Sequence, residues 1–358
     1  MAEFFIEIGS EEIPSSYIEP ALKYMEEEIS SFFSRNRVQA ETPKTMGTPR
    51  RLVLSVKGVT KIQKDYVEEF LGPGVSVAFD EKGQPTKAAI GFARGKGLDV
   101  ADLIRKQTPK GEVVCALIKN KGRSTSSLLN DYLPQLIHEI PFQKKMRWAN
   151  NSRPFARPLH WVVALFDGKS LEFEFDGIVN DVVSRGHRFL KPEQFSINGA
   201  ESYLKECKKH FLMIDPEARK VSILEQVQGL AQKAGGYIKE DEDLLNMVNF
   251  LVEYPVAIKG IFDPSFLELP KELLVISMKY HQKYFPVWDK KDKLLPCFIT
   301  VSNMPEEKGN EIKKGNERVL RARLEDARFF YDEDRKKNIE DFVESLKGVV
   351  FQKKLGTI

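Results

Sequence analysis

The first 56 residues alternate between the two periodicities of regular secondary structure, and this alternation constrains the fold most. A short apolar run at residues 4–8 ends at Gly9, and from Tyr17 apolar residues recur at helical spacing. Residues 51–56 alternate apolar side chains as a strand does, and Val53 makes the second face apolar as well. This strand–helix–strand opening predicts an α+β or α/β domain.

The rest of the chain continues to mix strand and helix patterns. The dipeptides Asp167-Gly168 and Asp176-Gly177 each join two predicted strands and are typical of hairpin turns. Pro134 indicates a break or kink in the helix that it interrupts. Predicted strands cover residues 112–119, 159–166, 170–175, 178–183, 256–261 and 294–301, and predicted helices cover 124–140, 199–207, 216–235, 241–252, 315–331 and 339–346.

These elements predict an α+β protein with two or more mixed modules followed by a C-terminal helical segment. One boundary is placed near residue 141, where Pro141 opens an arginine-rich segment, and a second near residue 308, where 306–314 is a charged connector. The predicted domains are 1–140, 141–308 and 309–358. A domain inserted within another would displace either boundary.

Composition limits the class of protein. The 358 residues carry a net charge of only +3, so any nucleic-acid surface must come from local clustering of basic residues. Three widely spaced cysteines fit a reducing compartment. The acidic N-terminus does not fit a signal peptide, and no segment approaches the ~18 apolar residues of a membrane span. We therefore expect a cytoplasmic protein with no membrane association.

Motifs for independent catalysis are weak or absent in the sequence. Residues 91–97 (GFARGKG) lack the spacing and the Ser/Thr of a phosphate-binding loop, and a basic flexible loop is the expected alternative. No GxSxG motif is present. The histidines form no HExxH motif and pair with no cysteine at ligand spacing, so we expect no metal site. They are His138, His160, His187, His210 and His281.

Two segments concentrate arginine beside aromatic residues. They are residues 144–160 (KKMRWANNSRPFARPLH) and 184–189 (SRGHRF). Guanidinium groups match phosphate geometry and flat rings can stack on bases, so both segments are candidates for RNA contact. The alternative is a solvated face above buried aromatic residues, because arginine beside proline and tryptophan also packs and anchors backbone.

Two later segments have the same ambiguity. Residues 315–331 place Leu320 and Leu324 on one apolar helical stripe beside a stripe of arginines, which is either a solvated face or a strip aimed at RNA or an acidic partner. Residues 278–303 contain His281 between Lys279 and Lys283. These three side chains would share a face in a strand but spread apart in a helix. His281 lacks a partner for metal binding nearby, so we expect an RNA-contacting or structural residue.

Eight motifs in order give the chain a specific resemblance. It resembles the β subunit of bacterial heterotetrameric glycyl-tRNA synthetase from residue 3 to residue 356. The motifs are 5–14 (FIEIGSEEIP), 48–52 (TPRRL), 146–148 with 155–161 (MRW and FARPLHW), 185–189 (RGHRF), 253–255 (EYP), 269–285 (LPKELLVISMKYHQKYF), 315–324 (GNERVLRARL) and 326–330 (DARFF).

The resemblance implies a division of labour. The family's α subunit holds the catalytic core and uses ATP and Mg²⁺, while its β subunit binds tRNA and is required for charging. Family β subunits continue into an HD-like domain and a helical anticodon-binding domain, and we expect this chain to be their N-terminal part. Its modules would then resemble the body and tail of archaeal CCA-adding enzymes and the B3/B4 domain of the phenylalanyl enzyme.

The leading hypothesis is therefore a non-catalytic β subunit of glycine–tRNA ligase. Its implied partners are tRNA(Gly), the α subunit and a second β subunit in an α2β2 tetramer, and no cofactor is expected in this chain. One alternative is a scaffold that binds the α subunit without touching RNA. Another is an independent phosphodiesterase using His187 or His281. The predicted RNA contacts are Arg147, Arg153, Arg157, Arg185, His187, Arg188, Lys279, His281, Lys283, Arg318, Arg321 and Arg328.

Overall fold

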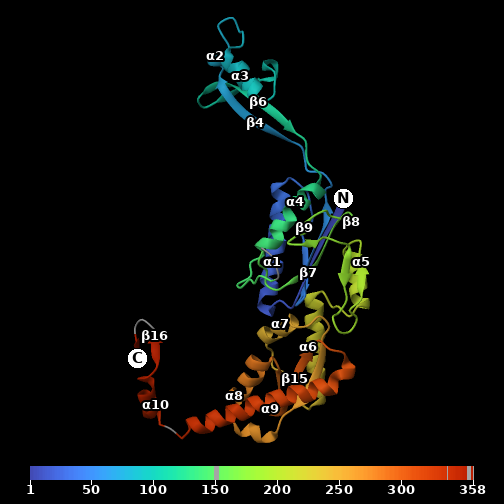
Figure 1. Cartoon of the computed structure of the whole chain (residues 1–358), viewed down its shortest axis with the longest axis vertical. Coiled ribbons are helices and arrows are strands. Elements are labelled where there is room, and N and C mark those ends of the chain that lie inside the picture. Colours follow the sequence, from blue (N-terminus) through green and yellow to red (C-terminus); the bar gives the residue numbers. More distant parts are fainter. Residues whose placement is uncertain (149–152, 337, 353–355, 358) are drawn as a thin grey trace.

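The computed structural model describes residues 1–148, 153–336, 338–352 and 356–357. Figure 1 shows an elongated chain in which a central body has one module beyond each end. We call these the body module (residues 1–60 and 125–212), the insert module (66–120) and the C-terminal module (216–334). Helices and several small antiparallel sheets occur in the same chain, which confirms the mixed α+β class.

A five-stranded antiparallel sheet forms the centre of the body module. In its register Ile6 lies opposite both Leu54 and Ala164. The last two strands come from beyond residue 141, so the sheet combines residues from both sides of that predicted boundary. In spatial order the strands are β2 (Lys44–Thr48), β3 (Arg51–Val59), β1 (Ala2–Ser10), β7 (Leu159–Phe166) and β8 (Lys169–Ser170).

Both faces of this sheet are covered. Helices α1 (Ser15–Arg35) and α4 (Thr125–Glu139) pack on one face. Helix α5 (Ala200–Lys209) and a hairpin cover the other face, where Val53 is buried as its pattern predicted. Helix α4 runs through Pro134 without a break. The hairpin pairs β11 (Val183–Arg185) with β12 (Gln194–Ser196).

The two Asp-Gly turns form hairpins as predicted. Asp167 and Gly168 join β7 to β8, while Asp176 and Gly177 join β9 (Glu174–Phe175) to β10 (Ile178–Val179). All four residues have φ between 52° and 86°. Positive φ at both central residues is what a two-residue turn with the right-handed twist of the strands requires.

The insert module is a small, separate unit at one end of the molecule (Figure 1). Its sheet has the order β4–β6–β5, and its buried apolar residues are Ala78, Ala89, Ala93, Val114, Cys115 and Ala116. Residues 91–95 belong to α3, so the predicted flexible loop at 91–97 is wrong over most of its length. The elements are β4 (Tyr66–Gly74), α2 (Val75–Ala78), α3 (Lys87–Gly95), η1 (Val100–Asp102), β5 (Ile104–Thr108) and β6 (Gly111–Asn120).

The C-terminal module packs helices around a second antiparallel sheet. Leu320 and Leu324 of its long helix are buried, which confirms the apolar stripe. The predicted connector at 306–314 is wrong, since this segment is helical. The elements are α6 (Pro216–Lys233), α7 (Glu242–Asn249), β13 (Val256–Ile261), η2 (Pro264–Glu268), α8 (Lys271–Ile276), η3 (Ser277–His281), β14 (Phe285–Trp288), β15 (Leu294–Ser302), η4 (Glu306–Lys308) and α9 (Gly309–Asp334).

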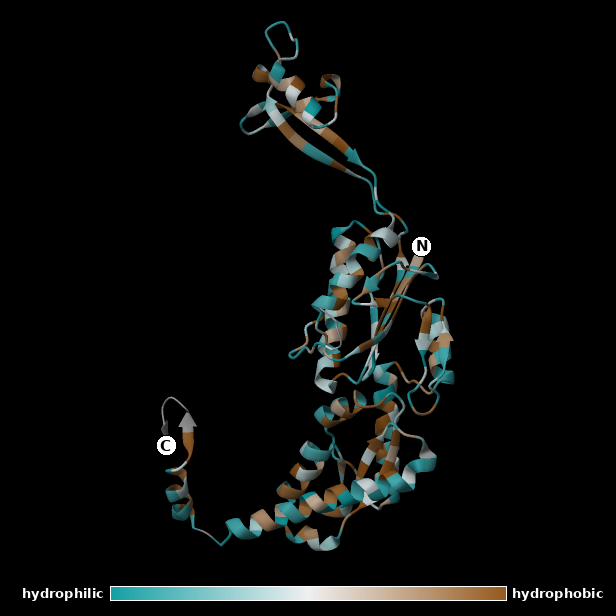
Figure 2. Cartoon of the chain, viewed as in Figure 1, coloured by the Kyte–Doolittle hydropathy of each residue, from teal (hydrophilic) through white to brown (hydrophobic). Residues whose placement is uncertain are grey.

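Hydropathy follows this architecture. Figure 2 shows mostly hydrophobic strands in the body sheet, whereas the long helices carry hydrophobic and hydrophilic residues side by side. None of the described helices is both long and apolar enough to cross a membrane. After α9 the described elements are α10 (Ile339–Leu346), β16 (Val350–Gln352) and β17 (Gly356–Thr357).

Candidate nucleic-acid interface

The motifs that carry the resemblance converge on a buried arginine, Arg51. Its side chain is fully buried at the start of β3 and contacts two carboxylates. The Nη1 group donates to Glu7 Oε1 at 2.9 Å, and Nε donates to Glu253 Oε1 at 2.8 Å. Burial opposes the charge of Arg51, but Glu253 and Glu7 together raise its pKa. The guanidinium also donates to Ser184 Oγ and to the Gly186 carbonyl.

Glu253 belongs to the C-terminal half of the chain, so these contacts join the two modules. Its Oε1 also accepts from Thr48 Oγ1 at 2.7 Å. Burial opposes its ionisation, but Arg51 and Thr48 lower the pKa of Glu253. A buried carboxylate is tolerated when a cation and a hydroxyl partner compensate its charge. We call this contact region between the body and C-terminal modules the junction.

A second buried arginine ties the junction through backbone carbonyls. Arg219 of α6 donates from Nε to the Asn249 carbonyl at 2.9 Å and from Nη2 to the Gly47 carbonyl at 2.8 Å. Burial lowers the pKa of Arg219 to about 10. Because Gly47 lies in β2 and Asn249 ends α7, this one side chain connects the body sheet to two helices of the C-terminal module.

Three guanidinium groups surround Trp161 beside the junction. The indole ring lies over Gly9, where an added Cβ would meet the ring at 2.0 Å. The Cζ atoms of Arg50, Arg51 and Arg185 lie 5.8, 5.1 and 5.1 Å from the ring centroid. Such positions are favourable because the ring face carries negative electrostatic potential.

The rim of this arrangement is partly exposed and mostly basic. Glu11 Oε1 accepts from Arg188 at 2.9 Å and lies 2.8 Å from His160 Nε2. Burial opposes its ionisation, but the bond to His160 and the charges of Arg188 and Arg50 lower the pKa of Glu11. Arg188, His160 and Glu11 have side-chain exposures of 39%, 35% and 30%. We define the Trp161 cluster as Glu11, Arg50, His160, Trp161, Arg185 and Arg188.

His187 lies in the interior and serves the fold. Its Nδ1 accepts from the backbone N–H groups of Phe189 and Leu190, so its Nε2 carries the proton and donates to Asn303 Oδ1 at 2.9 Å. Asn303 Oδ1 also accepts the backbone N–H of Glu253. Burial lowers the pKa of His187. Because both ring nitrogens are engaged, we expect no direct RNA contact from this residue.

The other predicted arginines of the body module lie between residues 147 and 157 and differ in exposure. Arg147 is exposed, while Arg153 has its Cζ 5.5 Å from the Phe175 ring centroid. Arg157 is half-buried and donates to the Ala156 carbonyl. Of the predicted residues in this module, the structure brings Arg185 and Arg188 together, and RNA contact by each of the exposed ones stays a prediction.

The predicted contacts of the C-terminal module divide between two elements. His281 is exposed at the end of the π-helical turn η3, so the strand-like shared face for 279–283 does not form. Lys279 forms an ion pair with Asp241, and Lys283 donates to the Tyr280 carbonyl. On α9, Arg328 donates to Ser265 and stacks over Phe266, while Arg318 and Arg321 are exposed. Their RNA contacts stay predictions.

The sequence reasoning missed the residues that connect the modules. The motifs that contain Arg50, Arg51 and Glu253 were used only to identify the resemblance to the family. Trp161 is the last residue of another such motif. One signal could have found the site: Glu7 is a charge inside an apolar strand pattern, and a buried carboxylate requires a partner. The part of the chain that the structure describes contains no group of three metal-ligating side chains.

The fold and site define a class first: a mixed α+β protein of three modules with a basic, partly exposed cluster beside a buried ionic junction. The family is equally clear. The chain belongs to the family described as the glycyl-tRNA synthetase β subunit, whose model matches residues 4–358.

Individual relatives agree with this assignment. The glycine–tRNA ligase β subunit of Geobacter metallireducens is 48% identical over 357 residues, covering 100% of this chain and 52% of the relative. The β subunit of Citrifermentans bemidjiense is 50% identical over 355 residues, covering 99% of this chain and 52% of the relative. That of Geobacter sulfurreducens is 48% identical with the same coverage. The chain spans about half the length of the curated relatives it matches.

Proposed function

We propose that this chain binds tRNA and supports a catalytic α subunit as the non-catalytic β subunit of glycine–tRNA ligase. In this proposal the α subunit uses ATP and Mg²⁺ to glycylate tRNA(Gly), and two copies of each subunit assemble in the cytoplasm. Family membership along residues 4–358 supports the β-subunit role.

The Trp161 cluster carries the proposal of tRNA binding. Arg185 and Arg188 present partly exposed guanidinium groups, which suit phosphate oxygens geometrically. Deeper in the cluster, Arg50 Nε and Trp161 Nε1 are buried donors without a hydrogen-bond partner among the residues that the structure describes. Buried donors without partners are uncommon in folded proteins. An RNA backbone on the rim would add acceptors beside the partly exposed carboxylate of Glu11.

Salt-titrated binding of tRNA(Gly) to the 358-residue chain tests this proposal. The logarithm of the affinity should fall linearly with the logarithm of salt concentration, with a slope of roughly 0.7–0.9 per phosphate contact. The double variant R185A/R188A should bind more weakly and reduce the slope by about 1.5, since two contacts are lost.

Arg35 supplies the matched control, because its side chain is exposed on α1, remote in sequence from the cluster. R35A should keep the parent affinity and slope. Parent-like binding by R185A/R188A would refute the role of the cluster. The triple variant R147A/R153A/R157A tests the neighbouring predicted contacts in the same assay, and unchanged binding would remove those three residues from the interface.

A second candidate function is a scaffold that binds the α subunit without contacting RNA. The observation that favours it is the use of motif residues inside the junction, where Arg51, His187 and Glu253 are all buried. Co-purification of this chain with the α subunit after nuclease treatment, together with no measurable tRNA affinity, would support the scaffold over tRNA binding.

A further inference from the structure

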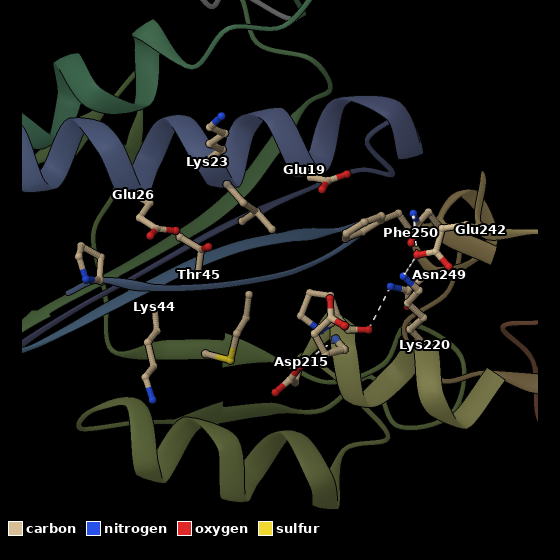
Figure 3. A pocket seen from close by; sticks show the side chains of 16 residues that line it. Glu19, Lys23, Glu26, Lys44, Thr45, Asp215, Lys220, Glu242, Asn249 and Phe250 are labelled. Carbon is tan, nitrogen blue, oxygen red and sulfur yellow. Dashed lines mark hydrogen bonds and ion pairs between the residues drawn. The ribbon is translucent and has the colours of Figure 1, made fainter. Parts of the chain in front are cut away.

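A cleft of about 600 Å³ lies on the junction, on a surface built from both modules. Figure 3 shows side chains of α1 and β2 on one side and side chains of α6 and α7 on the other. The body contributes Glu19 and Glu26, and the C-terminal module contributes Glu217 and Asn249. An occupant of this cleft would therefore contact both modules at once.

The charge of the cleft is opposite to that of the chain. Five carboxylates and three lysines line it, which leaves a net formal charge of −2 in a protein with +3 overall. Two of the lysines are already paired, Lys220 with Glu242 and Lys23 with Glu27. By contrast, the carboxylates of Glu19, Glu26 and Glu217 have no partner among the described residues.

An unpartnered acceptor lies in the lining of the same cleft. Asn249 is 2% exposed, and its Nδ2 donates to the Pro216 carbonyl at 3.0 Å. This bond fixes the orientation of the amide, and Oδ1 is left buried with no donor from the described part of the chain. Each unsatisfied buried polar atom in a native structure calls for a partner. The missing group must be a hydrogen-bond donor.

Apolar side chains complete the cleft beside Asn249. Leu22, Met46 and Phe250 line it together with the carboxylates. A lysine or arginine side chain has an apolar stem and a cationic head that only donates hydrogen bonds. Both of its parts therefore match this lining, whereas a phosphate group would meet excess negative charge and an acceptor.

We infer that this cleft binds a lysine- or arginine-bearing segment of a protein partner. The inference rests on the proposed function, because the partner to which we assign the segment is the catalytic α subunit. The cationic head would lie near Asn249 Oδ1, and the free carboxylates of Glu26 and Glu217 would flank the segment. RNA and protein would then use different surfaces of the junction, the Trp161 cluster and this cleft.

Charge reversal inside the cleft tests the inference. The double variant E26K/E217K should weaken binding of the purified α subunit to this chain by about tenfold, because two attractive charges become repulsive. Its affinity for tRNA(Gly) should not fall. N249L removes the acceptor and should also weaken α binding.

The chain offers a matched control for each reversed charge. Glu201 is exposed on α5, Glu225 is exposed on α6, and neither lines the cleft. E201K/E225K makes the same change in net charge and should bind the α subunit as the parent does. Circular dichroism and thermal unfolding identify any variant that fails to fold, and the charge-reversal pair is decisive because Glu217 is exposed and Glu26 half-buried.

Each outcome separates this inference from the proposed function. Parent-strength α binding by E26K/E217K would overturn the inference alone. Equal weakening by E201K/E225K would also overturn it, since general charge would then explain the effect. Stronger tRNA binding by E26K/E217K with unchanged α binding would assign the cleft to RNA. No α binding by the parent chain would overturn both the inference and the proposed support of the α subunit.

Discussion

The body module meets its two neighbours in opposite ways. At the junction with the C-terminal module, Arg51 and Arg219 are buried and contact groups from both sides. The insert module is joined to the body by two chain segments, residues 61–65 and 121–124, which we call the neck. There the two segments exchange backbone hydrogen bonds with each other and with the adjoining residues. Gln63 N–H donates to the Arg123 carbonyl at 3.0 Å, and Thr125 N–H donates to the Lys61 carbonyl at 2.9 Å.

This difference indicates how firmly the body holds each of its two neighbouring modules. Buried ion pairs have a defined geometry, and losing one partner leaves an uncompensated charge, so the junction fixes the C-terminal module in one position. The neck joins the body to a module whose buried apolar residues are few and mostly small, namely Ala78, Ala89, Ala93, Val114, Cys115 and Ala116. Few buried apolar contacts favour local opening. We expect the insert to open independently of the other two modules.

Arg51 gives the largest expected effect. The variant R51M removes the cation and leaves the buried carboxylates of Glu7 and Glu253 without compensation. Breaking a buried pair in this way costs about 3–5 kcal/mol. Urea-induced unfolding should show that loss in the free energy of unfolding, and the C-terminal module should become sensitive to proteolysis.

The exposed pair of Arg35 with Glu28 provides the comparison, at an N–O distance of 3.4 Å. R35M should change the free energy of unfolding by no more than about 0.5 kcal/mol, as surface substitutions usually do. If R51M were as mild as R35M, the junction would not be held by its buried charges, and the contrast with the neck would disappear.

Gly122 gives the next largest effect, at the neck. A Cβ atom at this position would lie 1.7 Å from the carbonyl oxygen of Gln63, so the two chain segments could not approach as they do. G122A should cost about 1–3 kcal/mol through the forced backbone shift. Hydrogen exchange should accelerate in residues 66–120 and stay unchanged in the body sheet.

Gly91 is the matched glycine, because it lies in α3 of the same insert and an added Cβ would meet nothing within 4 Å. G91A should leave exchange in the insert unchanged or slower, since alanine favours helix by roughly 1 kcal/mol over glycine. Faster exchange in the body sheet of G122A would contradict the independence of the insert.

The sequence predicts local elements of this fold far better than its connections. Periodicity and turn chemistry are local, so the strand at Arg51, the helix from Pro216 and both Asp-Gly hairpins are correctly predicted. The prediction for residues 91–95 was wrong because a glycine-rich pattern hides a short helix that packing supports. The prediction for residues 306–314 was wrong because a charged pattern also fits an exposed helix.

The candidate site was predicted only in part, for a physical reason. Arginine beside an aromatic residue has the same pattern whether it faces RNA or a buried carboxylate, and the partner decides which. The partner of Arg51 in the C-terminal module is about 200 positions away, and that of His187 is Asn303. No local pattern encodes such distances, so Arg188 and His187 looked alike in sequence although one is exposed and the other buried.

His187 makes the junction sensitive to pH. Burial holds its folded-state pKa below the ordinary value of 6.5, so the unfolded chain binds more protons as the pH falls. Stability should therefore decrease as the pH drops below about 6.5 and continue to decrease down to the folded-state pKa. The unfolding free energy should be lower at pH 5.5 than at pH 7.5, and this residue should contribute at most about 1.4 kcal/mol to the difference.

The variant H187N removes the titrating ring, so its difference between the two pH values should be smaller than that of the parent. His281 lies in an exposed position of the C-terminal module and serves as the control, with H281N keeping the parent's pH dependence. A parent-like slope in H187N would show that other groups produce the acid sensitivity and that the junction does not depend on a neutral His187.

The smallest effect is expected from an ion pair that links the neck to the body's hairpin, Lys61 with Asp167. Both side chains are more than a third exposed, at 57% and 40%, so water and salt screen their attraction. K61A should change the unfolding free energy and the hydrogen exchange of residues 66–120 by no more than the experimental error. Any residual change should vanish in 0.5 M salt, because the screening length at that concentration is only about 4 Å. A clear acceleration of exchange in the insert would mean that a surface charge pair helps hold the neck. Ion pairs would then hold both the neck and the junction, and the two connections would differ only in how deeply those pairs are buried.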